Sequence, residues 1–269
     1  MGALRILVSN DDGIGAPGIQ ALALALADCH EVYVVAPDRE RSATGHALTL
    51  HRPLRAEHYE LGDKIRAAWA VSGTPSDCIK LALGTLLEAP PDLVVSGINR
   101  GPNLGTDVLY SGTVSAALEA VINGVPAVAF SLTAFVDAGY EPCAAFAREL
   151  VAQLPIENLP EQCLLNVNFP FLEAGGAYHG VRVTRLGRRK YRDRFEHRTD
   201  LRGRTFYWLA GEAEEQGEHP ASDVVAIQEG YVTITPIQYD MTRYTLLDTV
   251  REWNVQLQSQ ATAQQPGAT

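Results

Sequence analysis

Cysteine, methionine and long hydrophobic runs are scarce in this sequence of 269 residues. The four cysteines lie far apart without a C-x-x-C motif, so we expect buried free thiols rather than disulfides or a thiolate zinc site (Cys29, Cys78, Cys143 and Cys163). The seven histidines form no H-x-x-x-H pair, which argues against a zinc–histidine site. No segment approaches the roughly 20 apolar residues of a membrane span. The first apolar stretch, in MGALRILVSNDDG, is too short for a signal peptide, so we expect a cytoplasmic protein without a membrane partner.

Positive charge is also in short supply, because 22 Lys and Arg face 32 Asp and Glu, for a net charge of −10. This balance argues against nucleic acid as a partner, although one local positive site suffices for a small phosphorylated ligand. Hydrophobic residues make up 46% of the chain, which is enough for a substantial core. The length suits one large domain, with or without a smaller appended part.

Apolar segments alternate with helix-forming segments as far as Pro170. We expect strands at 6–9, 32–36, 67–72, 92–96, 126–132 and 163–169, with helices at 17–27, 74–87, 113–122 and 142–153. The strands lack polar alternation, which is typical of strands buried on both faces. The pattern predicts an α/β fold with a Rossmann-like, doubly wound and mostly parallel sheet over residues 1–170.

The pattern changes after Pro170, where three strand-like segments follow at 181–186, 205–210 and 231–237. We expect no helix between these strands, and therefore a β-hairpin-rich C-terminal extension over 171–257. A terminal helix is expected at 245–257. The tail QSQATAQQPGAT consists mostly of small and polar residues, and we expect these residues, 258–269, to be disordered.

The segment RILVSNDDGIGAPG contains two competing signals. Gly13, Gly15 and Gly18 match the dinucleotide-binding pattern G-x-G-x-x-G, and Asp38 follows at the distance of a ribose-binding acid. Pro17, however, removes a backbone donor from the loop that would hold the pyrophosphate. Two aspartates directly before the glycines would also repel a phosphate. An NAD(P)-dependent oxidoreductase is therefore the alternative function.

Asp11 and Asp12 are better explained by a cation. Oxygen-bearing side chains follow several strands, and the carboxyl ends of parallel strands meet at one edge of a sheet. Ser or Asn from the neighbouring strand ends would complete an all-oxygen ligand set, which favours Mg²⁺ or Mn²⁺ over zinc. The simpler interpretation is that Asp-Asp-Gly forms a turn with an aspartate as a helix cap.

Ser111, Gly112 and Thr113 open a predicted helix after a small-residue loop. Free backbone N–H groups and the positive end of the helix dipole bind phosphate, so we expect these residues to bind a substrate phosphate. An ordinary Ser/Thr cap is the alternative. The neighbouring Tyr110 is a candidate for stacking on a nucleobase, and packing in the protein interior is the alternative role for its ring.

At this point several long motifs resemble the SurE family of survival proteins and nucleoside-monophosphate phosphatases. They run in order from about residue 4 to about 255: SNDDG with APG, VVAPDRxRS, SGTPSDC, PDLVVSGINRGPNLG, YSGTVSAALEA and EGYVTITPI. The resemblance implies one divalent metal ion per subunit, bound by four residues that match the family's ligands: Asp11, Asp12, Ser42 and Asn99. It also implies hydrolysis of nucleoside 5'-monophosphates, with 3'-monophosphates and short polyphosphate as further substrates in some members.

On this basis the expected protein is a metal-dependent 5'-nucleotidase. Asp11 and Asp12 bind the metal, and one of them has the further candidate roles of general base and nucleophile. Asn10 and Asn103 are expected to orient the phosphate or the attacking water. A regulatory protein that only binds nucleotides is a second alternative. A homodimer or homotetramer is expected, with the 171–257 region in the contacts.

Ten of the 22 Lys and Arg residues lie between Arg182 and Arg204. Three acidic residues interrupt this segment, so a solvated, salt-bridged hairpin is one interpretation. The family resemblance suggests an arm that makes oligomer contacts. The third interpretation of this segment is a positively charged rim that attracts nucleotides or polyphosphate.

Overall fold

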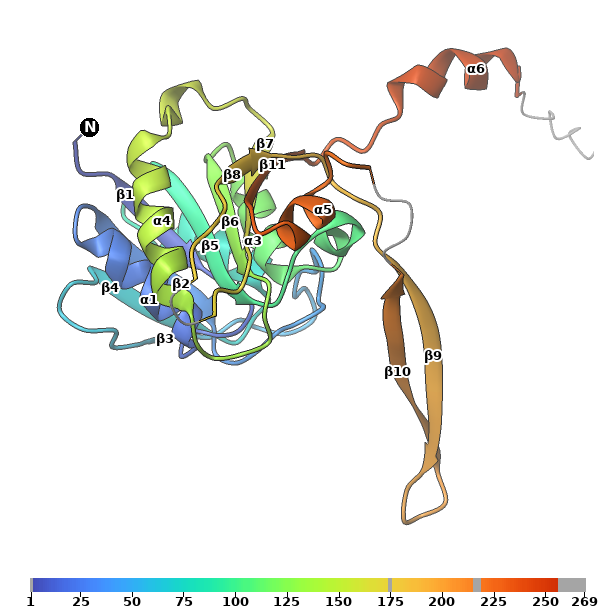
Figure 1. The fold of residues 1–269 in the computed structure, drawn as a ribbon. Helices are drawn as coiled ribbons and strands as arrows, with labels where there is room; N and C mark the ends of the chain where they lie inside the picture. The colour runs from blue at the N-terminus through green and yellow to red at the C-terminus, as the bar shows by residue number, and fades with distance from the viewer. Residues whose placement is uncertain (1, 174–175, 215–218, 256–269) are drawn as a thin grey trace, which may run out of the picture. The chain divides into compact units, whose positions relative to one another are not determined.

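A nine-stranded sheet forms the centre of the molecule in the computed structural model, which describes residues 2–173, 176–214 and 219–255 (Figure 1). The strand order is β3-β4-β2-β1-β5-β6-β7-β11-β8. The strands comprise β1 (Arg5–Ser9), β2 (Glu31–Pro37), β3 (Ala56–His58), β4 (Ala67–Val71), β5 (Leu93–Arg100), β6 (Ala127–Leu132), β7 (Cys163–Phe169), β8 (Val181–Val183) and β11 (Val232–Gln238). The predicted α/β fold with a mostly parallel sheet is confirmed.

The order of the parallel strands reverses beside β1. This strand pairs in parallel with β2 on one side, where Val8 lies opposite Val34, and with β5 on the other, where Ser9 lies opposite Ser96. The loops after β1 and β5 therefore diverge from neighbouring strand ends and leave a crevice between them. Such a reversal is the place where open α/β sheets bind their ligands.

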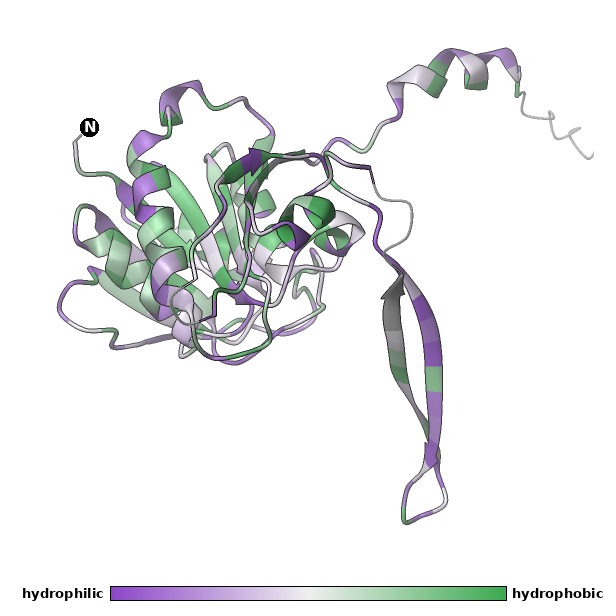
Figure 2. Ribbon diagram, in the orientation of Figure 1, coloured by the Kyte–Doolittle hydropathy of each residue, from purple (hydrophilic) through white to green (hydrophobic). Residues whose placement is uncertain are grey.

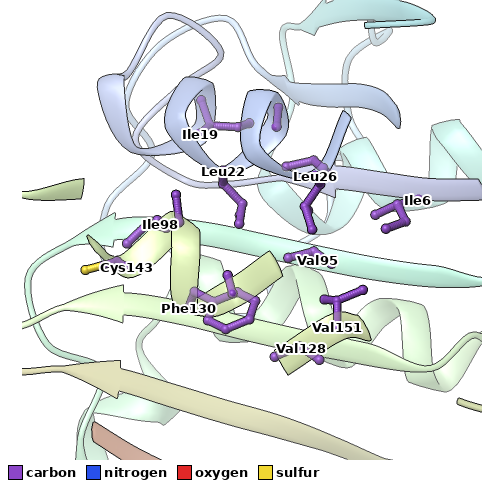
Figure 3. Packing of buried hydrophobic residues seen from close by; sticks show 14 of the residues in the cluster. Ile6, Ile19, Leu22, Leu26, Val95, Ile98, Val128, Phe130, Cys143 and Val151 are labelled. Atoms are coloured by element: carbon purple, nitrogen blue, oxygen red, sulfur yellow. The ribbon is translucent and has the colours of Figure 1, made fainter. Parts of the chain in front are cut away.

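Helices cover both faces of the sheet, as the unbroken apolar strands predict. Ile6 and Val8 pack with helices α1 (Pro17–Ala27) and α4 (Tyr140–Gln153), whereas Leu7 faces α2 (Pro75–Leu81) and α3 (Gly112–Ile122). This division follows from the alternation of side chains along a strand. Figure 3 shows the first layer, with Ile19, Leu22 and Leu26 of α1 over the sheet.

Local signals fix where the helices begin. Thr74 and Asp77 form a reciprocal capping box at the start of α2, in which the Thr74 side chain accepts from the backbone N–H of Asp77 at 3.1 Å. This helix ends at Leu81 and continues as a π-helical segment over Ala82–Leu86, so the predicted helical stretch to about residue 87 has two parts. Ser111 caps α3 by accepting from Val114 N–H at 3.0 Å.

The region after Pro170 contributes to both sheets. β11 runs antiparallel to β7 and β8 runs parallel to β11, so both extend the central sheet. Strands β9 (Lys190–Thr199) and β10 (Thr205–Glu214) form a separate antiparallel hairpin. Helix α5 (Asp223–Gln228) lies between β10 and β11, which makes the expectation of no helix there wrong. At six residues this helix is too short to show a helical period in the sequence.

The hairpin contains most of the basic segment, and some of its arginines make ion pairs. Arg198 contacts Glu196 at 3.2 Å and Arg204 contacts Asp200 at 2.9 Å. Figure 2 shows that β9 is mainly hydrophilic, in contrast to the strands of the central sheet. These contacts favour the interpretation of the segment as a salt-bridged hairpin.

Described residues up to Tyr239 form one compact unit, and those from Asp240 form a second. The second contains a 3₁₀ turn (Tyr244–Leu246) and helix α6 (Leu247–Glu252), which is shorter than the predicted helix at 245–257. Residues 256 and 257 and the tail at 258–269, for which we predict disorder, lie outside the described residues. The division into 1–170 and 171–257 stays a prediction.

All four cysteines are free, as expected. Cys78 and Cys143 are buried and Cys163 is partly buried, but Cys29 is exposed, so the expectation of a buried thiol is wrong at Cys29. The wrong assignment has a simple cause, because Cys29 lies just beyond the end of α1, where the chain turns toward β2. Among the described helices, none combines the length and the hydropathy needed to cross a membrane.

Candidate functional site

The predicted metal ligands come from two loops and from the end of strand β5, around the β1–β5 crevice. Asp11 and Asp12 lie in the turn after β1, Ser42 lies in the loop after β2, and Asn99 lies near the end of β5. The pairing of β5 with β6 shifts register between Ser96 and Asn99, which breaks the regular ladder just before this residue. The fold thus carries all four residues to one edge of the sheet.

Asp11 is the most buried of the four, with 4% of its surface exposed. Its Oδ1 accepts a hydrogen bond from the hydroxyl of Thr113, in the first turn of α3. A Cβ at Gly112 would lie 2.7 Å from the Cβ of Asp11, so only glycine allows α3 to approach so closely. Burial raises the pKa of Asp11, although the Thr113 hydrogen bond opposes this rise.

Asp12 points toward the end of β5. Its Oδ2 accepts the backbone N–H of Arg100 at 2.9 Å, next to Asn99. Burial, followed by the adjacent charge of Asp11, raises the pKa of Asp12 to about 7. Two such carboxylates are costly to keep ionised together unless a cation offsets their charge.

Backbone contacts hold the Ser42 loop against the β1 end. Arg41 N–H donates to the carbonyl oxygen of Asp11 at 2.7 Å, and Ile14 N–H donates to Pro37 O at 2.9 Å. The Ser42 hydroxyl donates to Glu40 at 2.7 Å, which leaves its oxygen lone pairs free to bind a cation. Ser42 is therefore placed beside Asp11 although 31 positions separate the two in the chain.

Asn99 is oriented by its own amide group. The amide nitrogen Nδ2 donates to the carbonyl oxygen of Gly101 at 2.9 Å. This contact leaves the amide oxygen Oδ1 as the atom that can serve as a ligand.

The three residues predicted to bind phosphate have different environments. Ser111 caps α3 and lines a cleft at the site, whereas the Thr113 side chain is fully buried against Asp11. Gly112 packs on the same aspartate. The structure therefore gives Thr113 and Gly112 direct contacts with a predicted metal ligand.

Asn10 and Asn103 are both buried. The amide of Asn10 donates to Gly13 O at 2.9 Å and holds the turn after β1, while its Oδ1 has no hydrogen-bond partner among the described residues. Asn103 lines the cleft and donates from Nδ2 to the Ser131 hydroxyl at 2.8 Å. Its backbone N–H donates to Asn168 Oδ1 at 2.9 Å.

A cleft of about 870 Å³ connects these residues. Its polar part is lined by Asp11, Ser42, Asn99, Asn103 and Ser111. The lining also includes residues that sequence reasoning missed, notably Arg189 and Tyr191 at the root of the hairpin. The sequence offered only one signal for them, their place in the basic segment.

The donor set suits a hard divalent cation. Carboxylate, hydroxyl and amide oxygens are the ligands of Mg²⁺ and Mn²⁺, and the raised pKa values of Asp11 and Asp12 show that a positive charge would be stabilising there. Among the described residues, no group of three or more His, Cys, Asp or Glu side chains offers a metal site. A cation in this cleft would therefore depend on Ser42 and Asn99 in addition to the two carboxylates.

The glycine pattern has a structural explanation without a dinucleotide. A Cβ at Gly18 would lie 2.0 Å from the carbonyl oxygen of Ile98, so this glycine permits close packing of α1 on β5. Gly13 adopts a positive φ of 99° in the turn after Asp12. Asp38, the candidate ribose-binding acid, forms an ion pair with Arg41 of the same loop at 3.4 Å.

Comparison with known proteins identifies clear relatives. A family profile described as "Survival protein SurE" matches residues 6–193. A protein of Trichormus variabilis named "5'-nucleotidase SurE" is 53% identical over 262 residues, which cover 93% of this chain and 98% of that protein. A protein of the same name from Synechococcus elongatus is 56% identical over 252 residues, which cover 91% of this chain and 97% of that protein.

A solved structure shares the fold. The crystal structure of the SurE protein from Aquifex aeolicus matches with a TM-score of 0.79 at 39% sequence identity. The match covers 93% of this chain and 100% of that one.

Proposed function

This chain belongs to the SurE family, and we propose that it is a 5'-nucleotidase that hydrolyses nucleoside 5'-monophosphates to nucleoside and phosphate. One structural observation carries the proposal beyond the family: Asp11, Ser42 and Asn99 line the same cleft at the strand-order reversal. The family also implies a divalent metal cofactor. We propose one Mg²⁺ or Mn²⁺ ion per subunit, held by Asp11, Asp12, Ser42 and Asn99.

Bound there, a divalent cation would neutralise charge on the phosphoryl group and lower the pKa of a bound water. The chain's own residues orient the components of the reaction. Thr113 fixes the Asp11 carboxylate, and the backbone N–H of Arg100 fixes that of Asp12. Hydrolysis of a phosphate monoester depends mainly on such positioning and on charge stabilisation.

We propose that Ser111, at the start of α3, receives the phosphate oxygens that face away from the carboxylates. Gly112 and Thr113 support this position from behind, through their contacts with Asp11. Asn103 lines the cleft and is a candidate for orienting the phosphate or the attacking water. Asn10 supports the turn that carries both aspartates.

Several finer features belong to the same proposal. Nucleoside 3'-monophosphates and short polyphosphate are further candidate substrates, because the residues proposed to bind the metal and Ser111 would contact only the phosphate of a substrate. We propose a homodimer or homotetramer in which the 171–257 region contributes contacts. A cytoplasmic location is consistent with these substrates.

Phosphate release tests the proposal directly. The purified chain is incubated with 5'- and 3'-nucleoside monophosphates and with tripolyphosphate, each with Mn²⁺, Mg²⁺ or EDTA. We expect release from 5'-monophosphates with a divalent metal and none with EDTA. Nucleotide binding without release under any metal would indicate a regulatory protein and contradict the proposed activity.

A further inference from the structure

The cleft is lined by two chemically different sets of residues. In addition to the oxygen-bearing side chains, its wall includes Leu109, Tyr110, Phe135, Tyr191 and Leu209. These side chains are largely exposed, although apolar groups usually pack away from water. A nucleoside monophosphate has the matching division, with a charged phosphate at one end and a flat aromatic base at the other.

Tyr191 differs from the other aromatic residues of this wall because its ring is held in place. Its hydroxyl donates to Asp107 Oδ2 at 2.7 Å. The same carboxylate oxygen contacts Arg189 Nη1 at 2.6 Å, and both members of this ion pair are largely buried. The Arg189 guanidinium also lies 5.6 Å from the centre of the Tyr191 ring.

The root of the hairpin is in turn fixed to the loop that follows β5. Asp223 accepts the backbone N–H of Gly187 and that of Gly105, each at 2.8 Å. The Thr106 hydroxyl donates to the carbonyl oxygen of Arg189 at 2.6 Å. A Cβ at Gly105 would lie 2.9 Å from Gly187 O, so the two backbones are in direct contact. These contacts set the position of Tyr191 relative to the cleft.

We propose that Tyr191 binds the nucleobase of the substrate by stacking, an inference that rests on the proposed nucleotidase function. The ring is 45% exposed and lines the cleft that contains the phosphate end. Asp107 Oδ2 contacts both Arg189 and the Tyr191 hydroxyl, which leaves this carboxylate oxygen poorly placed to read the edges of a base. Stacking without edge recognition accepts every base, so the site should discriminate weakly between purines and pyrimidines.

A comparison of substrates with and without a base tests this inference. Adenosine 5'-monophosphate and ribose 5-phosphate share the phosphate ester but only the first has a base. We expect Tyr191→Ala to raise KM for adenosine 5'-monophosphate about fivefold or more, the low end of the effect of losing one stacking ring. The kcat for this substrate and the kinetics with ribose 5-phosphate should stay unchanged.

Two further variants separate stacking from structure. Tyr191→Phe retains the ring and should resemble the wild type more closely than Tyr191→Ala. Tyr207→Ala removes an exposed ring from the other strand of the same hairpin, outside the cleft lining. This variant should leave the kinetics with both substrates unchanged. Equal effects of Tyr191→Ala on both substrates, or no effect on either, would overturn the inference.

Equilibrium binding keeps this test independent of the proposed activity. The affinities of adenosine 5'-monophosphate and ribose 5-phosphate are measured for the wild type and Tyr191→Ala. A loss of affinity confined to the nucleotide supports stacking even in a protein that releases no phosphate. If Tyr191→Ala leaves the ratio of the two affinities unchanged while the wild type releases phosphate, the nucleotidase function stands and Tyr191 is not the base-binding residue.

Discussion

The backbone N–H of Arg41 donates a hydrogen bond of 2.7 Å to the carbonyl oxygen of Asp11. This contact joins the loop after β2 to the end of β1, and it places Ser42 beside the two carboxylates. Backbone hydrogen bonds thus help to hold together the segments from which the site is assembled.

Replacing Asp11 should abolish turnover while leaving the fold intact. Asp11→Asn keeps the size of the side chain but removes its negative charge, so we expect kcat to fall by about 100-fold or more. Phosphate release from a 5'-monophosphate measures the effect, and circular dichroism checks the fold. Asp63→Asn, at an exposed position outside the cleft, is the matched control. Retained activity in Asp11→Asn would show that the ligand assignment is wrong.

The hydroxyl of Thr113 should matter through Asp11 alone. Thr113→Val removes the hydrogen bond to the carboxylate and preserves the shape of the side chain. Loss of such a supporting contact typically costs roughly 10–100-fold in metal affinity or activity. We expect Thr113→Val to need a higher Mn²⁺ concentration for half-maximal activity. In Thr113→Ser, which keeps the hydroxyl, this concentration should return to that of the wild type. An unchanged metal requirement in the valine variant would argue against this supporting role.

Gly18 should be essential to the packing of α1 on β5. In Gly18→Ala the new Cβ would lie 2.0 Å from the carbonyl oxygen of Ile98, which is backbone and cannot rotate away. We expect a loss of about 1–3 kcal/mol in the free energy of unfolding, measured by urea denaturation. At Gly84, also helical, a Cβ meets no atom within 4 Å, so Gly84→Ala is the control and should not destabilise. Equal stability of the two variants would contradict the close packing.

Glu119 should make the protein sensitive to acid. Its side chain is 3% exposed and contacts His46 at 2.6 Å and Lys80 at 2.7 Å, with Asn123 donating at 2.8 Å. Despite burial, these contacts lower the pKa of Glu119 from 4.5 to about 2. A carboxyl with a lowered pKa stabilises the folded state above its unfolded pKa, and this contribution is lost as the pH falls from about 4.5 toward 2.

Urea denaturation at a series of pH values checks this prediction. Between neutral and strongly acidic pH, the free energy of unfolding of the wild type should fall by up to about 3 kcal/mol more than that of Glu119→Gln, because the glutamine cannot titrate. The difference between the two proteins removes the contribution of the other carboxyl groups. Parallel stability curves for both would mean that Glu119 contributes nothing to the acid sensitivity.

Contiguous sequence motifs predicted much of the site. Asp11 and Asp12 follow a clear apolar strand, and Ser111 precedes a clear helix, so each could be placed from its neighbours alone. Ser42 and Asn99 were assigned through the family resemblance, since nothing local marks one serine or one asparagine as a ligand. The structure brings Ser42 and Asn99 to the same cleft as Asp11, while their role in metal binding stays a proposal.

Contacts between distant segments could not be predicted in this way. The sequence predicts that Thr113 binds a substrate phosphate at the start of a helix, but it gives no sign that the Thr113 hydroxyl bonds to a carboxylate 102 positions earlier. Tyr191 lines the cleft beside a hairpin root that Asp223 ties to the segment after β5. Helix α5 was missed because its six residues derive their stability from packing and a serine cap rather than from a visible period.

By itself, the sequence determined the alternation of strands and helices, because side-chain periodicity and capping residues act over a few neighbouring positions. It also determined which chemical groups stand at the strand ends. Only the tertiary structure decided which loops meet, which polar side chains line the cleft and which aromatic ring is held beside them. These features depend on backbone contacts between segments far apart in the chain, such as Arg41 with Asp11, and no local pattern encodes them.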